Sequence, residues 1–197
     1  MKTLKINLSK MTMHMLLLIV LFNSACGQSE KNTTANSNTE INNIVDKPEV
    51  DIHTAIITGN LEVVKHHIKV GTDINQKEAM SGSTPLMSAV TFNKQEIAKL
   101  LIEANADLSI KNNDGSTALH TAAFFGRIEI VQMLMDAKAD KTIRNNFGAT
   151  PRETVMGDFA EVKPFYDMLV QQLKPMGFEL DMDELKKARP VIAIMLQ

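Results

Sequence analysis

Cys26 is the residue whose type and position most clearly suggest chemistry in this 197-residue chain. As the only cysteine it cannot form an internal disulfide, but its thiol could be acylated. The adjacent His66 and His67 would point about 100° apart on a helix and make a poor metal chelate. Asp181 and Asp183 lack a calcium-loop pattern and are better placed to begin a helix, where carboxylates are favoured. Phosphate-loop, serine-hydrolase, zinc-protease and paired-cysteine motifs are missing, so we expect no enzyme, no bound metal and no cofactor.

Residues 1–25 have the organisation of a secretory signal peptide. Lys2, Lys5 and Lys10 give a positive start, residues 11–22 are almost entirely apolar, and small residues follow. These are the three parts of an export signal. The apolar run is too short to cross a bilayer as a helix, which needs about 20 residues. We therefore predict that residues 1–25 are a removed leader and that the mature chain is exported.

Cys26 lies where this leader ends. Ser24-Ala25-Cys26 resembles the lipobox of bacterial lipoproteins, although Asn23 stands where that family usually has Leu. The resemblance implies that Cys26 is acylated and anchors the chain in a lipid bilayer, and two or more acyl chains suffice for stable attachment. Gly27 after the cysteine, rather than Asp, implies the outer membrane, with the protein facing the periplasm. The alternative is an ordinary signal peptide cut near Ala25, which would leave a free thiol.

Residues 26–47 are predicted to be a flexible linker. They are rich in Asn, Thr, Ser and Glu and nearly free of large apolar side chains. Such a segment cannot bury enough surface to offset the entropy lost on ordering. About 20 flexible residues span roughly 25 Å, which would lift a folded domain clear of the lipid headgroups.

From residue 48 onward the sequence repeats with a period of roughly 33 residues. Asp73, Asp107 and Asp140 mark successive periods, and the first step is one position longer than the second. Two short motifs recur in the same register. The first is a Thr-Pro or Thr-Ala start, seen in Thr84-Pro85-Leu86, Thr117-Ala118-Leu119-His120 and Thr150-Pro151. The second is a Gly or Asn followed by a short acidic and apolar run, seen in Gly59–Val64, Asn93–Ala98 and Gly126–Val131.

This pattern resembles the ankyrin repeat, and the resemblance covers residues 48–157. It implies an all-α fold, an ankyrin-repeat solenoid of helix-turn-helix units with β-turn or hairpin tips, whose function is to bind another protein. It also implies that His53 and His120 hydrogen-bond neighbouring turns. The residues agree with it physically, because Thr is a good N-cap and Pro85 suits a first helical position. Lys138 falls where the family has Gly, at a helix end that favours a left-handed residue, and is a poor choice there.

The two ends of the repeat array are expected to act as caps. In the first repeat His66 and His67 stand where the other repeats have apolar pairs, which predicts a polar outer face on this terminal unit. Residues 158–197 are predicted to form a helical C-terminal cap. Its first helix covers residues 161–173, and the second helix of the fourth unit is left open because Pro164 falls inside the expected span. Another helix begins near Asp181 or Asp183.

The family resemblance also suggests where a partner would bind. Partners of ankyrin solenoids usually lie against the turn tips and the ends of the first helices. One extra residue near Met80 would lengthen the first tip. Aromatic residues at these places could form a partly exposed binding strip; the alternative is that the rings only fill contacts between repeats. The candidate partner-binding residues are Met80, Ser83, Phe92, Asn113, Asp114, Ser116, Phe124, Phe125, Asn146 and Phe147.

The leading hypothesis is a membrane-anchored ankyrin-repeat lipoprotein that binds a protein partner in the bacterial envelope. The apolar fraction of 44% allows a packed core, and a net charge of −2 with no basic stretch argues against nucleic acid as the partner. Two alternatives remain at this stage. One is a structural organiser of the envelope without a tight partner, and the other is an enzyme with an unfamiliar site.

Overall fold

The computed structural model describes residues 48–197. These residues lie in one compact unit, Asp46–Gln197, and the secondary structure assigned to them is helical, with no strand. None of the helices found in residues 48–197 is both long enough and apolar enough to span a bilayer. The predicted signal peptide, Cys26 and the linker lie outside the described residues.

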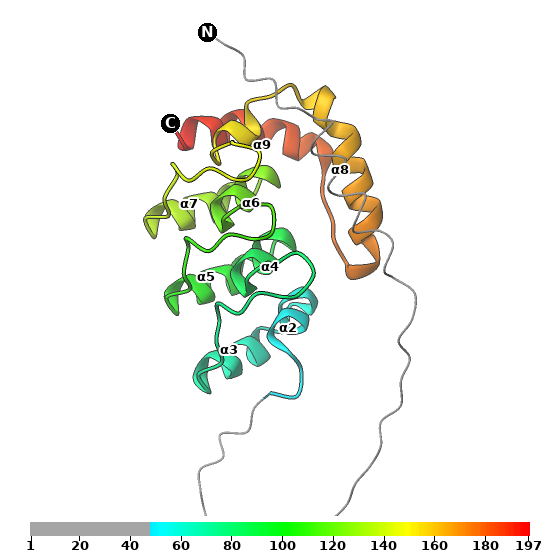
Figure 1. The fold of residues 1–197 in the computed structure, drawn as a ribbon. Helices are drawn as coiled ribbons and strands as arrows, with labels where there is room; N and C mark the ends of the chain where they lie inside the picture. Colours follow the sequence, from blue (N-terminus) through cyan, green and yellow to red (C-terminus); the bar gives the residue numbers. More distant parts are fainter. Residues whose placement is uncertain (1–47) are drawn as a thin grey trace, which may run out of the picture. The chain divides into compact units, whose positions relative to one another are not determined.

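Three helix pairs stack in register, and a fourth, differently built unit closes the stack (Figure 1). In each pair a short inner helix is followed by a longer outer helix. Inner helices contact inner helices of neighbouring units, and outer helices contact outer ones. The inner helices are α2 (Ile52–Thr58), α4 (Pro85–Thr91) and α6 (Ala118–Phe124), and the outer helices are α3 (Leu61–Lys69), α5 (Gln95–Glu103) and α7 (Ile128–Asp136).

The helix boundaries follow from the capping residues. The side chain of Asp51 accepts a hydrogen bond from the Thr54 N–H, and that of Thr84 accepts one from the Met87 N–H at 3.3 Å. Pro85 is the first residue of α4, where no N–H is needed. Helices α2 and α4 are therefore each started by a polar side chain that satisfies a backbone donor otherwise left unpaired.

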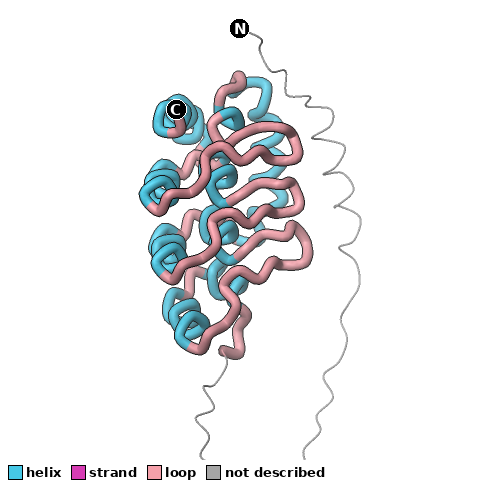
Figure 2. The backbone as a smooth tube through the Cα atoms, turned by 60° about the vertical axis from the view of Figure 1, so that its left-hand side comes forward, coloured by secondary structure: helices cyan, strands magenta, loops and turns pink. Residues whose placement is uncertain are grey.

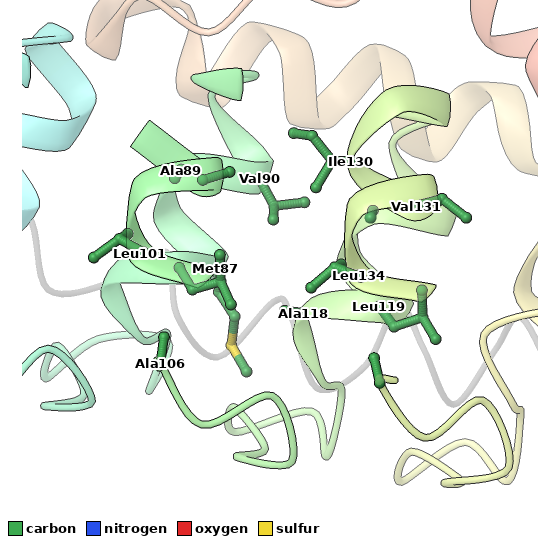
Figure 3. Packing of buried hydrophobic residues seen from close by; sticks show 14 of the residues in the cluster. Met87, Ala89, Val90, Leu101, Ala106, Ala118, Leu119, Ile130, Val131 and Leu134 are labelled. Atoms are coloured by element: carbon green, nitrogen blue, oxygen red, sulfur yellow. The ribbon is translucent and has the colours of Figure 1, made fainter. Parts of the chain in front are cut away.

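The core lies between successive units (Figure 3). Ala89 and Ala122 are fully buried on the inner helices and keep the distance between neighbouring inner helices short. Leu101, Leu119 and Leu134 are also fully buried. Burying one such leucine contributes about 1.5–3 kcal/mol relative to an exposed position. Because these side chains pack against the next unit, the stability of each unit depends on its neighbours.

The fourth unit has a reduced inner helix and takes its outer helix from the C-terminus. The 3-10 helix η2 (Glu153–Val155) contacts α6, and α9 (Met182–Met195) contacts both α7 and η2. Arg152, which stands where the other repeats have an apolar residue, donates from Nε to the Ala193 carbonyl of α9 at 2.9 Å. The segment after the repeats is thus helical, and α9 supplies the second helix that the sequence left open.

Between η2 and α9 the chain forms α8 (Phe159–Leu173) and the 3-10 helix η3 (Lys174–Met176). In Figure 1, α8 runs back along the stack beside α6 and α4. Asp158 caps its start by accepting from the Ala160 N–H. Pro164 lies inside α8 without ending it.

The first unit differs from the expected polar cap at His67. Only 2% of this residue is exposed. Its Nε2 lies 2.7 Å from the Val50 carbonyl oxygen and its Nδ1 lies 3.0 Å from the Thr72 hydroxyl. His67 is therefore not part of a polar outer face. It is buried, and its ring nitrogens connect the segment before α2 to the loop that follows α3.

Replacing Lys138 with glycine is expected to stabilise the stack by about 1 kcal/mol. Lys138 follows α7 with φ of 63°, a left-handed conformation that costs a side-chain-bearing residue about 1–2 kcal/mol. The gain corresponds to a rise of about 3 °C in melting temperature, measured by calorimetry. Asn105 has the same φ of 63° after α5 and is the matched control. Because Asn tolerates this conformation, Asn105→Gly should gain clearly less, and equal gains would contradict the explanation.

Candidate functional site

Three loops project from one side of the stack and are called the fingers here: residues 76–83, 110–116 and 143–149 (Figure 2). Backbone hydrogen bonds close each finger at its base. The Asn112 N–H donates to the Ser116 carbonyl at 2.9 Å, and the Asn145 N–H donates to the Ala149 carbonyl at 3.0 Å. In the first finger the Glu78 N–H donates to the Ser83 carbonyl at 2.9 Å.

The second and third fingers are held in shape by one asparagine each. Asn112 Oδ1 accepts from the backbone N–H groups of Asp114 and Ser116 at 3.0 and 2.9 Å. Asn145 Oδ1 accepts from those of Phe147 and Ala149 at 3.0 and 3.1 Å. The same side-chain type thus closes both tight turns in the same way, as expected for asparagine.

The first finger is one residue longer, and Glu78 replaces asparagine at its base. The carboxylate accepts from the backbone N–H groups of Met80 at 2.7 Å, Ser81 at 2.6 Å and Ser83 at 3.3 Å, and from the Ser81 hydroxyl. The longer side chain reaches across the extra residue. Burial of the carboxyl alone would raise the pKa of Glu78, but the hydrogen bonds from Ser81, Met80 and Ser83 outweigh it and lower that pKa.

Successive fingers are joined by backbone and amide hydrogen bonds at their ends. The Asn113 N–H donates to the Ser81 carbonyl and its Nδ2 donates to the Met80 carbonyl, both at 2.9 Å. In the next step the Asn146 N–H donates to the Asp114 carbonyl at 2.9 Å and its Nδ2 donates to the Asn113 carbonyl at 3.0 Å. Asn113 and Asn146, both predicted to face a partner, therefore also fix the spacing of the fingers.

The remaining predicted finger residues divide into two kinds. Ser83 and Ser116 lie within the fingers, where the Ser83 hydroxyl is 2.7 Å from that of Ser81 and the Ser116 hydroxyl is 3.5 Å from Asn145 Nδ2. Met80 and Phe147 are exposed at 58% and 37% and lie at the ends of the first and third fingers. Together with the exposed Asp114 between them, these apolar side chains form the outward surface that we call the finger ends.

Two histidines connect the inner helices to the fingers, as the family resemblance implies. His53 Nε2 lies 3.3 Å from the Gln76 carbonyl, and His120 Nε2 lies 3.1 Å from the Ala149 carbonyl. The Thr117 N–H donates to His120 Nδ1 at 3.2 Å, which fixes the tautomer with the proton on Nε2. Burial lowers the pKa of His120, and the positive charge of Lys111 lowers it further, while the hydrogen bond to Ala149 opposes the shift. The neutral imidazole of His120 thus has a structural role: its hydrogen bond to Ala149 connects α6 to the third finger.

The C-terminal segment packs against the predicted aromatic strip on the inner-helix ends. Phe178, in the loop before α9, packs edge-on against Phe92 and Phe125, with ring centroids 6.0 and 5.3 Å apart. Tyr166 of α8 stacks on Phe124 at 4.6 Å and donates from its hydroxyl to the Phe124 carbonyl at 2.7 Å. Phe125 is only 8% exposed. Phe92 and Phe124 are half-buried. The C-terminal segment returns along the stack and packs on all three rings, so they contact the chain's own residues.

Two arginines that the sequence did not single out hold this returning segment. Arg127, at the start of α7, donates to the Thr91 carbonyl of α4 at 3.3 Å and to the Glu179 carbonyl at 3.2 Å. Burial lowers the pKa of Arg127 to about 10, although the charge of Glu184 opposes the shift. Arg189 of α9 is buried and donates to the Gly157 carbonyl at 2.9 Å. No short-range motif marks either residue, because their partners lie far away along the chain.

Among residues 48–197 no three His, Cys, Asp or Glu side chains come close enough to hold a metal ion. An open hollow of about 390 Å³ at the turn between α8 and α9 is lined by few titratable groups. Those groups are Lys174 and Glu179, which do not form an acid–base pair in the structure.

Removing the Glu78 carboxylate is expected to destabilise the protein by about 1 kcal/mol near neutral pH. Hydrogen bonds to a charged group contribute about 1.5–3 kcal/mol, and the partly exposed position of Glu78 reduces this. Since its pKa is lowered in the folded state, the contribution is present above the unfolded pKa of about 4.5 and is lost as the pH falls through the folded pKa. Urea denaturation of Glu78→Ala and the wild type should therefore converge at low pH.

Glu62→Ala is the control for this pH series. Glu62 is well exposed and pairs only with Lys65 on the surface of α3. Its removal should change the free energy of unfolding by less than about 0.5 kcal/mol at any pH in the range. A Glu78→Ala deficit that stays constant down to pH 3 would contradict the assigned role of the carboxylate.

Comparison with known proteins agrees with the geometry. The family model described as ankyrin repeats (3 copies) matches residues 52–145. Protein phosphatase 1 regulatory subunit 27 of Homo sapiens is 42% identical over 63 residues, which is 32% of this chain and 40% of that relative. A putative ankyrin repeat protein of Rickettsia bellii (strain RML369-C) is 41% identical over 68 residues, with the same two coverages, 32% and 40%.

A solved structure gives the same result for the fold. The crystal structure of the ankyrin repeat domain of Bcl-3 aligns with a TM-score of 0.51 and 31% sequence identity, over 52% of this chain and 45% of that chain. The chain thus spans less than half the length of each of these proteins. The three helix pairs, both histidines and the first two fingers lie within the matched region, and the third finger begins at its end. The stack is therefore an ankyrin-repeat solenoid, a protein–protein interaction module.

Proposed function

We propose that the chain is an exported lipoprotein whose ankyrin stack binds a protein partner in the bacterial envelope through the finger ends. The observation that carries this proposal is the exposure of Met80 and Phe147 on fingers that are fixed to one another. Exposed apolar side chains on a rigid support lose little entropy on binding. An aromatic ring and a methionine are also side chains that interfaces favour.

The location of this binding is proposed from the leader and Cys26. The basic start, the short apolar run and the single cysteine at its end support export followed by acylation. A lipid-anchored Cys26 and a polar linker over residues 26–47 would hold the fingers within reach of periplasmic proteins. The outer membrane is proposed from Gly27, which follows the cysteine in place of Asp.

Crosslinking and affinity capture of the full chain from its own envelope test the binding surface. Met80→Ser combined with Phe147→Ser should weaken capture of the specific partner at least tenfold, because both apolar contacts are lost. Met176→Ser is the matched control, since Met176 is 46% exposed but lies in η3, outside the fingers. Equal capture by the double variant and the wild type would overturn the assignment of the finger ends.

Labelling with a palmitate analogue tests the anchor. The wild type should carry the label and accumulate as a precursor in globomycin, and Cys26→Ser should be unlabelled. Asn23→Leu is the complementary variant. It introduces the residue that lipoproteins usually have at this position, so the precursor should be processed faster than in the wild type. An unlabelled wild-type chain would remove the lipoprotein part of the proposal and leave the binding part unaffected.

A further inference from the structure

The ends of inner helices α4 and α6 offer two kinds of contact to a covering segment. One is a row of rings, Phe92 and Phe125 at equivalent positions of successive repeats, with Phe124 beside them. The other is a pair of equivalent carbonyl groups, those of Thr91 and Phe124, in the last turns of their helices. Carbonyls at a helix end have no partner within the helix and need a donor from elsewhere.

In the structure, other parts of the same chain satisfy both kinds of contact. The Tyr166 hydroxyl of α8 donates to the Phe124 carbonyl at 2.7 Å, and an Arg127 N–H donates to the Thr91 carbonyl at 3.3 Å. Phe165 and Tyr166 pack on Phe124, with centroids 5.9 and 4.6 Å away. The end of α6, predicted from the sequence to face a partner, is thus occupied by an aromatic helix.

The attachment of α8 differs from that of α9. Helix α9 buries four residues and approaches α6, α7 and η2 closely along its backbone. In helix α8 only Tyr166 and Leu169 are buried. Among the described helices, its backbone comes close to that of η3. Its other face is polar and solvated, and carries the surface ion pair between Lys163 and Asp167. Contact with the inner helices is therefore made by a few side chains on one face.

The flanks of α8 permit movement of the helix as a unit. It is preceded by Gly157, whose carbonyl accepts a hydrogen bond from Arg189 of α9, and followed, after η3, by Gly177 in the left-handed conformation with φ of 78°. The Arg189 contact is the fixed point about which α8 can turn. Rigid-body displacement of an element needs only a few terminal residues that can change their backbone angles. Loss of Tyr166 from its site would leave Phe124 and its carbonyl exposed while α9 still closes the stack.

We infer that the end of inner helix α6 forms a helix-docking surface that α8 occupies as an internal ligand, and that a partner's amphipathic helix displaces it. This inference rests on the proposed function as a binding module. The partner helix carries an adjacent aromatic pair, as Phe165-Tyr166 does, with apolar residues one turn before and after it, as at Val162 and Leu169. A tyrosine hydroxyl on that helix would donate a hydrogen bond to the Phe124 carbonyl, as the Tyr166 hydroxyl does.

A labelled peptide with the sequence of residues 158–174 tests this directly on the full chain. In the wild type the tethered α8 has an effective concentration in the millimolar range, so the free peptide should bind weakly. In Tyr166→Ala the internal helix is weakened, and the unaltered peptide should bind at least tenfold more tightly. The same peptide carrying Tyr166→Ala should not bind. Absence of peptide binding to the Tyr166→Ala chain would overturn the inference.

Hydrogen exchange on the wild-type chain gives a second measurement that needs no variant. Amides of α8 should exchange faster than those of α6 and α9, because α8 opens without unfolding of the stack. Exchange of α8 at the rate of global unfolding would overturn the inference, as would a stable dimer with exchanged α8 helices in light scattering. Phe147→Ser should leave peptide binding unchanged, so failure at the finger ends and failure at the inner-helix ends can be told apart.

Discussion

Phe178→Ala is expected to lower the free energy of unfolding by about 3 kcal/mol, the lower part of the range for a buried phenylalanine. The ring is 2% exposed and lies against two rings from adjacent repeats, Phe92 and Phe125. Its removal leaves a cavity between the C-terminal segment and the inner-helix ends. Packing on both sides is lost because α4 and α6 cannot close the gap without disturbing the core between the repeats.

Phe147→Ala is the matched control for this change. It removes the same side chain from a finger end, where the ring is 37% exposed. Its effect on stability should stay within about 0.5 kcal/mol, as for most surface substitutions. Both variants can be compared by urea denaturation followed by far-ultraviolet circular dichroism. Equal losses of stability in the two variants would contradict the packing of Phe178 described above.

The repeat array could be predicted closely from the sequence because its signals are local. A capping threonine, a first-turn proline and a helix-ending Gly or Asn act within one unit, and Pro85 and Asn105 lie where they were expected to act. The histidine ties were also predictable, since His120 and the Ala149 carbonyl occupy places that recur with the period. Because the sequence is periodic, a contact between successive repeats can be predicted from equivalent positions in each repeat.

The sequence predicts that the C-terminal segment forms helices, but it does not predict where those helices lie on the repeat stack. The amphipathic pattern over residues 161–173 predicts a helix with one apolar face, and α8 has it. The pattern does not say which surface that face covers. Phe178 gives no warning of its role, because it is a lone ring between Gly177 and an acidic stretch. The covered state of Phe124 and Phe125 therefore had no sequence signal within their own repeats.

Local sequence signals were also insufficient for the first finger. The longer first step of the repeat showed that one residue was added near Met80, but not that Glu78 would compensate for it. In the structure Glu78 stands where the other fingers have Asn112 and Asn145, and its carboxylate receives three backbone N–H groups. The comparison of equivalent positions explains the substitution: a longer loop needs a longer acceptor. The rule becomes visible once the fingers are aligned in space.

Gly126→Ala is expected to destabilise the protein by about 3 kcal/mol, and Gly59→Ala by about 1 kcal/mol. Both glycines occupy the turn between an inner and an outer helix, with φ of 68° and 75°. Alanine in this left-handed conformation costs about 1–2 kcal/mol at either position. The added cost at Gly126 comes from α9. A Cβ there would lie 2.8 Å from Leu185 Cδ1 and 3.3 Å from Ala188 Cβ, and overpacking of this kind costs about 1–3 kcal/mol.

The environment of Gly59 makes it the control for backbone strain alone. A Cβ at Gly59 would meet only the flexible end of Lys94, at 3.4 Å or more. In the middle unit the equivalent residue is Asn93, with φ of 52°, which shows that a side chain fits this turn where α9 does not cover it. Calorimetry should therefore separate the two alanine variants by about 2 kcal/mol, the cost of overpacking alone. Equal costs would mean that α9 does not rest on the α6–α7 turn, and that the fourth unit closes the stack in another way.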